Sequence, residues 1–288
     1  VQPTWSLLLV EQFLTVSLMS TDPQFCVTPL DAQKASEELS LGTRIDRNGK
    51  TTYHVVSSDR KCGVFLEKVY DQEHRLVRLQ KRGSGSRCET QFNPESGAVV
   101  RIYESANLPD GNSLTKEIVY DKDDRANEAV VVLSPNGEIV RRVERQHYGV
   151  RTVYQGQTEY HQDGTPATTV NHHMDHSSGR LVRREQVQWL REGQRLLSEN
   201  FYFDQSGALQ KYSKVLFHAT AGPFIEETQM FDGQTQTILK REIAAFDVNG
   251  KQTCMDVLTY DDSGDVLERN SRFFDKDGKE IASLNSSQ

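Results

Sequence analysis

A short turn motif recurs through most of the chain and limits the folds that the chain can adopt. It consists of an aromatic residue, Asp, two further residues and Gly, and its strongest copies begin at Phe203, Phe246, Tyr260 and Phe274. In such a turn the Asp side chain accepts backbone N–H groups, and Gly takes the left-handed conformation that restarts a strand. Each copy predicts an antiparallel hairpin with a local bulge. The predicted turn residues are Asp204, Gly207, Asp247, Gly250, Asp261, Gly264, Asp275 and Gly278.

The spacing of the turns indicates an internal repeat. Gly250, Gly264 and Gly278 are 14 residues apart, which is the length of one strand and one turn. Looser copies of the motif begin at Ile45, Tyr70, Phe92, Tyr120 and Tyr160. Self-similarity at a fixed period is typical of repeat architectures. The sequence therefore predicts a repeat domain of serial antiparallel β-hairpins over residues 43–288.

The segments between the turns carry polar side chains on both faces. In segment 208–217, Lys211 and Ser213 fall on one face, and Gln210 and Lys214 fall on the other. A sandwich strand with one buried face alternates more cleanly. Apolar residues make up only 36% of the chain, which suits a sheet with little core. We expect a mostly β protein, either a spiralling open sheet or a large barrel with a wet interior.

Residues 1–42 differ from the repeat domain. Segment 5–14 is the most apolar part of the chain, but it is too short to span a bilayer and Glu11 interrupts it. It predicts a core helix or a first strand, with a targeting or anchoring segment as the alternative. The sequence begins with Val1 rather than Met, which indicates a processed or trimmed chain.

A short helix is predicted within this N-terminal segment, over residues 28–39. Thr28 is placed to cap it, and Pro29 suits the first helical position. Gly42 follows the last helical residues and is expected to stop the helix.

The aromatic-Asp-x-x-Gly turn resembles the YD repeat of Rhs-type proteins. Tyr260-Asp261 is the Tyr-Asp pair itself, and Phe-Asp pairs stand at positions 203, 246 and 274. Arg180-Leu181 follows Gly179 as Arg-Leu follows Gly in that family, although the repeat here is shorter. The turn is also similar to the short hairpin repeats of bacterial envelope and antitoxin-like proteins. The resemblance implies a spiralling β-sheet like those of secreted toxin shells and cell-surface adhesion proteins. It favours a secreted or cell-envelope location and leaves a cytoplasmic one open.

Four cysteines are far apart in the sequence. No C-x-x-C pair is present, so nothing indicates a structural zinc site or a redox motif. Cys62 and Cys88 both stand beside turn-like residues, which makes a disulfide between them one interpretation. Isolated buried thiols, including Cys26 and Cys254, are the other interpretation.

The candidate metal sites are incomplete. A loop that begins at Asp275 resembles an EF-hand loop, but Lys279 occupies a position where a ligand oxygen is required. His173 and Asp175 would form half a site and would need ligands from another strand. We expect no metal site and no cofactor, and we expect segment 171–176 to be a solvated loop or an edge.

The sequence carries no local signature of catalysis, since Gly-x-Ser-x-Gly and phosphate-binding loops are both absent from it. Trp189, Tyr202 and Tyr212 are candidates for a stacking platform for a sugar or a peptide, with ordinary packing as the alternative. The locally basic segments 141–145 and 180–195 are candidates for contact with an anionic partner, with a solvated face as the alternative.

These observations together predict a function class rather than an activity. A net charge of −7 argues against non-specific nucleic-acid binding. We expect a non-catalytic structural or binding protein that presents an extended β-sheet. Its partner would be another protein or a second copy, without a membrane span, in a secreted, envelope or particle assembly. The alternative is a small-ligand carrier or an enzyme with its site inside a barrel formed by the same meander.

Overall fold

Strands and turns make up all of the chain that the computed structural model describes, namely residues 38–45, 49–59, 63–121, 123, 125–218 and 222–287. No helix occurs among these residues, and so none of them belongs to a helix that could cross a membrane. The chain falls into two compact units, which divide between Ser84 and Gly85.

The first unit contains a four-stranded antiparallel meander. Each strand pairs with the next one in the sequence. The strands are β1 (Glu38–Ile45), β2 (Thr51–Asp59), β3 (Val64–Tyr70) and β4 (Leu76–Gly83).

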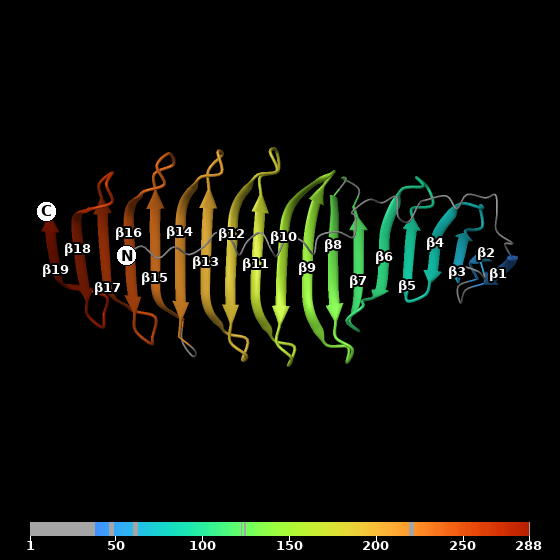
Figure 1. Cartoon of the computed structure of the whole chain (residues 1–288), viewed down its shortest axis with the longest axis horizontal. Coiled ribbons are helices and arrows are strands. Elements are labelled where there is room, and N and C mark those ends of the chain that lie inside the picture. The colour runs from blue at the N-terminus through green and yellow to red at the C-terminus, as the bar shows by residue number, and fades with distance from the viewer. Residues whose placement is uncertain are drawn as a thin grey trace. The chain divides into compact units, whose positions relative to one another are not determined.

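The second unit is an antiparallel sheet whose strands lie side by side in chain order (Figure 1). They are β5 (Ser86–Phe92), β6 (Val99–Asn107), β7 (Ser113–Tyr120), β8 (Arg125–Leu133), β9 (Ile139–Tyr148), β10 (Arg151–Tyr160), β11 (Pro166–Met174), β12 (Leu181–Trp189), β13 (Arg195–Phe203), β14 (Leu209–Phe217), β15 (Pro223–Phe231), β16 (Ile238–Phe246), β17 (Gln252–Tyr260), β18 (Val266–Phe274) and β19 (Glu280–Ser287). Among the described strands β19 pairs with β18 alone. The meander therefore does not close, and the large-barrel alternative is wrong.

The predicted N-terminal helix is not confirmed. Residues 1–37, which include the apolar segment, lie outside the described residues. Glu38 and Leu39, the last residues of the predicted helix, belong to β1 instead. Gly42 lies inside this strand opposite His54, because pairing with β2 supplies the backbone hydrogen bonds that a helix would have supplied. The strands thus begin by residue 38 rather than residue 43.

Each strong turn is held by its Asp side chain. Asp204 Oδ1 accepts the N–H groups of Ser206 and Ala208 at 2.8 and 2.9 Å. Asp247, Asp261 and Asp275 each accept the N–H groups two and four residues later at 2.8 to 3.0 Å. Hydrogen bonds from Ser206 and Ala208 hold the pKa of Asp204 below its usual value. The turn at Asp204 is therefore stabilised by a carboxylate that stays ionised.

The glycine of each turn restarts the next strand. Gly207 has φ +90°, and Gly250, Gly264 and Gly278 have φ between +76° and +86°. The preceding strand ends at the aromatic residue, where the pairing register shifts by one residue, as at Phe203. Because the turns recur at equal intervals, β16, β17, β18 and β19 begin at residues 238, 252, 266 and 280.

The described residues bury more polar than apolar side chains. The buried apolar residues are Val69, Ile102, Ala126, Val132 and Val187, and the buried polar residues are His54, Glu67, Asp71, Gln80, Thr90, Glu128, Ser198 and Ser271. No second sheet or helix occurs among the described residues of the second unit to cover either face of its sheet. The polar faces expected from the sequence therefore belong to a thin, open sheet.

We expect Gly264→Ala to destabilise the protein by about 1–2 kcal/mol, because alanine at φ +86° has a steric penalty that glycine avoids. The matched control is Gly222→Ala, since Gly222 has no positive φ and no neighbour within 4 Å of an added Cβ. Urea unfolding monitored by circular dichroism measures both variants. Equal stability of the two would contradict the role assigned to the turn glycine.

Candidate functional site

One face of the second unit carries an unbroken row of aromatic, cationic and thioether side chains. Consecutive members lie directly opposite each other in neighbouring strands from β10 to β16. We name the set the cross-strand row: Tyr154, His173, Arg183, Tyr202, Lys211, Met230 and Lys240. At a strand spacing of about 4.8 Å the row is about 29 Å long. It contains no carboxylate, although the chain has a net charge of −7.

Tyr202 lies near the middle of the row between two cations. The Arg183 guanidinium is 5.6 Å from the centre of the Tyr202 ring, and Lys211 Nζ is 5.8 Å from it. Both distances suit cation–π attraction. Arg183 also donates to Asn200 Oδ1 at 2.8 Å, which fixes its head group. The ring is thus held in a defined orientation on an open face.

Carboxylates beside the row neutralise some of its charge. Glu185 lies 3.9 Å from Arg183, and Glu242 lies 2.7 Å from Lys240. In the described part of the chain, Lys211 makes no ion pair within 4.0 Å. The row therefore presents aromatic side chains together with paired and unpaired cations, rather than a strongly basic surface.

The structure does not bring together the three aromatic residues that the sequence singles out. Tyr202 and Tyr212 project from opposite faces, since the partner of Tyr212 across β13 and β14 is Phe201. Arg183 of β12 is opposite Tyr202. Trp189 lies six residues further along β12 than Arg183, which corresponds to a distance of about 20 Å between Trp189 and Arg183. Of the three, Tyr202 alone belongs to the cross-strand row.

Trp189 and Tyr212 have local partners instead. Trp189 Nε1 donates to Thr169 Oγ1 at 3.1 Å. The Tyr212 hydroxyl donates to Glu199 Oε1 at 2.6 Å, and its ring lies 5.1 Å from that of Phe201. Burial and the Glu199 carboxylate raise the pKa of Tyr212. Both side chains are therefore engaged within the sheet.

The prediction of a loop or an edge for the histidine segment is wrong in part. Residues 171–174 form the end of β11, which is paired on both sides, and His172 and His173 project from its opposite faces. Asp175 and His176 lie in the turn that follows. Burial and the nearby Arg184 charge lower the pKa of His172, whereas the His173 ring lies 5.2 Å from that of Tyr154. The sequence marks this segment as polar, but it does not reveal that neighbouring strands supply its backbone partners.

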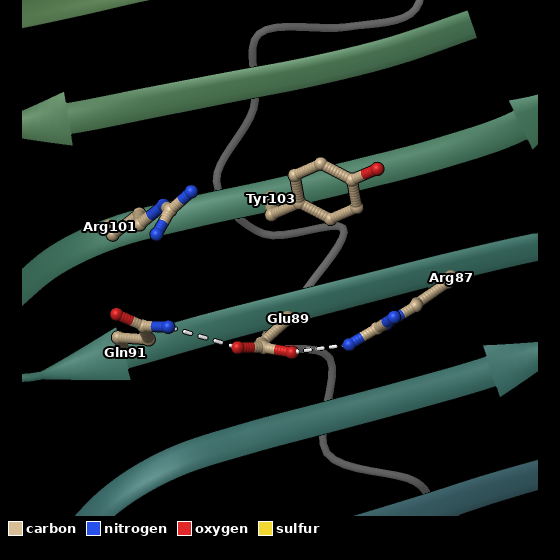
Figure 2. A pocket seen from close by; sticks show the side chains of 5 residues that line it. All are labelled: Arg87, Glu89, Gln91, Arg101 and Tyr103. Carbon is tan, nitrogen blue, oxygen red and sulfur yellow. Dashed lines mark hydrogen bonds and ion pairs between the residues drawn. The ribbon is translucent and has the colours of Figure 1, made fainter.

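A shallow hollow of about 220 Å³ lies over β5 and β6. Figure 2 shows the five side chains that line it: Arg87, Glu89, Gln91, Arg101 and Tyr103. Glu89 accepts hydrogen bonds from Arg87 at 2.8 Å and from Gln91 at 3.0 Å. Arg101 is paired with Glu117 at 2.7 Å. Since both guanidinium groups already have carboxylate partners, the hollow is a polar depression rather than an enclosed ligand cavity.

A buried carboxylate on the other face gathers three basic groups. The Glu128 side chain is 3% exposed and lies within 3.1–3.6 Å of His147, Arg145 and Lys116. Burial by itself would raise its pKa. The hydrogen bond from His147 and the charges of Arg145 and Lys116 instead lower the pKa of Glu128 to about 2. The ionised carboxylate thus joins β8 to β7 and β9. Thr152 extends the cluster to β10, because its hydroxyl lies 3.1 Å from His147 Nδ1.

This carboxylate, imidazole and hydroxyl chain faces away from the hollow. Tyr103 of the hollow is opposite Glu117, and Glu117 is opposite Ala129, the residue that follows Glu128. Successive side chains of a strand point to opposite faces. The Glu128 cluster is therefore on the face opposite the hollow, where it joins neighbouring strands.

The first unit contains a similar cluster. Glu67 Oε1 lies 2.7 Å from His54 Nδ1, and Glu67 Oε2 lies 3.4 Å from Arg78. Thr52 Oγ1 lies 3.1 Å from the other ring nitrogen of His54. Burial opposes ionisation, but the His54 hydrogen bond and the Arg78 charge lower the pKa of Glu67.

Neither cluster was predicted from the sequence, although the sequence carries one signal of the Glu128 cluster. Ala126, Val130 and Val132 occupy the same face of β8 as Glu128, so a carboxylate interrupts an otherwise apolar face. Such a residue is expected to be paired when it is buried. The basic partners of Glu128 come from neighbouring strands, and the register in which those strands pair could not be derived from the sequence composition.

We expect Glu128→Gln to destabilise the protein by about 3 kcal/mol at neutral pH, because it leaves three basic groups without their buried counter-charge. Glu144→Gln is the matched control, since Glu144 is 48% exposed and its pair with Arg142 is on the surface. We expect this control to change stability by less than about 0.5 kcal/mol. Urea unfolding distinguishes the variants, and equal losses would contradict the cluster's role.

The pH dependence of stability gives a separate prediction. Because the folded pKa of Glu128 is about 2 and its ordinary value is 4.5, its contribution is complete above pH 4.5 and is lost as the pH falls towards 2. The stability difference between the wild type and Glu128→Gln should shrink over that range, by about 3 kcal/mol. Unfolding curves recorded at successive pH values measure it. A difference that is constant with pH would show that Glu128 does not titrate in this way.

The free cysteine of the described region is Cys254, whereas Cys88 is disulfide-bonded. Cys62 and Cys26 lie outside the described residues. The interpretation of four isolated thiols is therefore wrong for Cys88. Burial and the Asp256 charge raise the pKa of the Cys254 thiol, which keeps it protonated.

Comparison with known proteins gives weak likenesses. The sequence matches no protein family and no curated protein. The crystal structure of TcdB2-TccC3 is 12% identical, with a TM-score of 0.14 over 86% of this chain and 22% of the other. The crystal structure of TcdB2-TccC3-TEV is 11% identical, with a TM-score of 0.13 over 98% of this chain and 23% of the other. The chain spans less than a quarter of either protein, and likeness at this level carries no argument about fold or function.

Proposed function

We propose that the chain is a non-catalytic structural or binding protein that presents its antiparallel sheet to a protein partner. The observation that carries this proposal is the cross-strand row on β10 to β16. Seven side chains from seven consecutive strands lie on one face, and their register places them in a continuous line.

Four of the seven side chains of the row are of types that are enriched in protein interfaces. Tyr, Met and Arg are enriched there, whereas Lys, Asp and Glu are depleted, so Lys211 and Lys240 do not share this preference. Tyr and Arg are also the residue types that most often dominate binding energy. In the row, Tyr202 is oriented by Arg183 and Lys211, and Met230 is 41% exposed. An orientation held before binding lowers the entropy cost of association.

The alternative, a small-ligand carrier or enzyme, has less support. The meander of the second unit is open at β19, and the hollow over β5 and β6 is shallow and internally ion-paired. Specific ligand sites are deeper and bury most of their ligand. The geometry therefore favours binding of a protein partner over binding of a small ligand.

A secreted or cell-envelope setting fits the same proposal. Cys88 is disulfide-bonded, and disulfides persist mainly in oxidising compartments. The Phe-Asp and Tyr-Asp turns resemble those of YD-repeat proteins, which carry spiralling sheets on secreted particles and cell surfaces. We therefore propose a YD-repeat-like hairpin scaffold in such an assembly.

A photo-cross-linking amino acid at Met230 tests the proposal in an extract of the native source. We expect adducts with one protein of defined mass at position 230. The matched control is the same label at Val248, which is 63% exposed but lies in a turn away from the row. With the purified partner, Tyr202→Ala should weaken binding about 30-fold, as expected for an interface hot spot.

Equal adducts at both positions, or unchanged affinity of Tyr202→Ala, would contradict the row as the contact surface. A saturable small ligand whose binding is lost in Tyr103→Ala would favour the carrier alternative instead. Circular dichroism of each variant is the control that shows whether the sheet is retained.

A further inference from the structure

A second row of side chains, on the face that carries the Glu128 cluster, contains four arginines. Its members lie directly opposite each other in neighbouring strands from β9 to β18. We name the set the arginine row: Arg145, Gln155, His172, Arg184, Phe201, Tyr212, Gln229, Arg241, Leu258 and Arg269. Neither a helix nor a second sheet covers this face among the described residues of the second unit.

Three of the four arginines have a carboxylate partner on the strand that precedes their own. The pairs are Arg145–Glu128 at 3.2 Å, Arg241–Glu227 at 2.8 Å and Arg269–Asp256 at 2.8 Å. The charge of each of these arginines is thus compensated within the sheet. Arg184 is the exception, because it makes no ion pair within 4.0 Å in the part of the chain that the structure describes.

The strands on either side of Arg184 explain this difference. β11 contains no Asp or Glu, and it places His172 opposite Arg184. β13 places Phe201 opposite Arg184, and the guanidinium lies 5.6 Å from the centre of that ring. Glu199, on the same face of β13, accepts a hydrogen bond from the Tyr212 hydroxyl instead. The two strands therefore orient the guanidinium but supply no counter-charge for it.

The Arg184 side chain is half-buried and its hydrogen-bonding capacity is only partly used. Its Nη2 donates to Gln186 Oε1 at 3.1 Å, whereas its Nε is buried and has no hydrogen-bond partner among the described residues. An arginine cannot lose its charge by deprotonation in a protein. Partial burial of an uncompensated charge costs free energy, which a bound anion would offset. Burial and the Arg184 charge also lower the pKa of His172.

We propose that Arg184 is the site at which this face of the sheet binds the carboxylate group of a ligand. A planar guanidinium matches a carboxylate through two parallel N–H···O hydrogen bonds. The three other arginines of the row all have carboxylate partners, and a single cation beside an uncharged His172 suits a monoanion. The carboxylate would belong to a small organic acid or to an acidic side chain of a polypeptide.

This inference goes beyond the proposed function and does not rest on the cross-strand row. Arg183 belongs to that row, and Arg184, the next residue of β12, projects from the opposite face. Loss of one site would therefore leave the other in place.

NMR of the histidine rings in the full chain tests the proposal. The probes are sodium acetate and a glycine–glutamate–glycine tripeptide that is blocked at both ends. We expect each probe to raise the pKa of His172, because a carboxylate beside Arg184 opposes the effect of the arginine charge. Around His172 the facing groups are Arg184 from β12 and the uncharged Gln155 from β10, and His173 is its neighbour in β11. The His172 signal is identified by its loss in His172→Gln.

Sodium chloride at the same ionic strength and the tripeptide with glutamine in place of glutamate are the controls for the probes. Arg184→Gln should abolish the response of His172 to both probes. Arg184→Lys should weaken binding about tenfold, because an ammonium group cannot form the bidentate pair. Arg241→Gln is the matched control and should respond like the wild type, since Arg241 is already paired with Glu227.

Urea unfolding of the same variants separates a binding role from a structural one. Arg241→Gln should lower the unfolding midpoint more than Arg184→Gln, because it leaves the carboxylate of Glu227 without its cation, whereas Arg184 has no carboxylate partner to lose. Circular dichroism shows whether each variant keeps the sheet.

The two probes distinguish the sources of the carboxylate. A tripeptide that binds at least as tightly as acetate points to an acidic side chain of a polypeptide, and binding of acetate alone points to a small organic acid. The proposal is overturned if His172 responds to neither probe, if chloride has the same effect as acetate, or if Arg184→Gln retains the response. A larger loss of stability in Arg184→Gln than in Arg241→Gln would also overturn it, because Arg184 would then be a structural residue.

Discussion

The hydrogen bonds from backbone N–H groups to a turn carboxylate are the interaction on which the rest of the structure depends. Asp204 and its equivalents at 247, 261 and 275 each accept the N–H groups two and four residues later. Because a turn of constant geometry sets the register of the strands on both sides, it also decides which side chains share a face. The alignment of Tyr202 with Lys211 is a product of that register, whereas Arg183 is aligned with Tyr202 across a turn of the same backbone form that begins at Leu190.

A sheet of this kind cannot depend on a large apolar core. With no covering layer among the described residues, its buried positions are mostly polar, and carboxylates such as Glu128 and Glu67 have to be paired where they are buried. The stability of the second unit thus comes from backbone ladders and from ion clusters that join several strands. This explains why an apolar content of only 36% suffices for a chain of 288 residues.

The local features of the fold could be predicted from the sequence, whereas the site could not. Turns such as 204–207 follow from the chemistry of Asp and Gly within five residues. The cross-strand row depends on pairing across seven strands, where the one-residue shift at Phe203 decides which neighbour Tyr202 meets. That shift places Tyr202 and Tyr212 on opposite faces, although the sequence suggested that both belong to one stacking platform. Segment 38–42 was misread because its pairing partner in β2 outweighs a helical pattern that is purely local.

The meander connectivity also bears on how the second unit reaches its native state. Strands such as β12, β13 and β14 each pair with the strand that precedes them and the strand that follows them, so contacts join residues that are close in the chain. The contact order is therefore low for a β protein, and the entropy lost on closing each loop is small. Nucleation at any hairpin can spread in both directions, as in repeat proteins. Local opening at β19 then leaves the pairing of distant strands such as β12 and β13 intact.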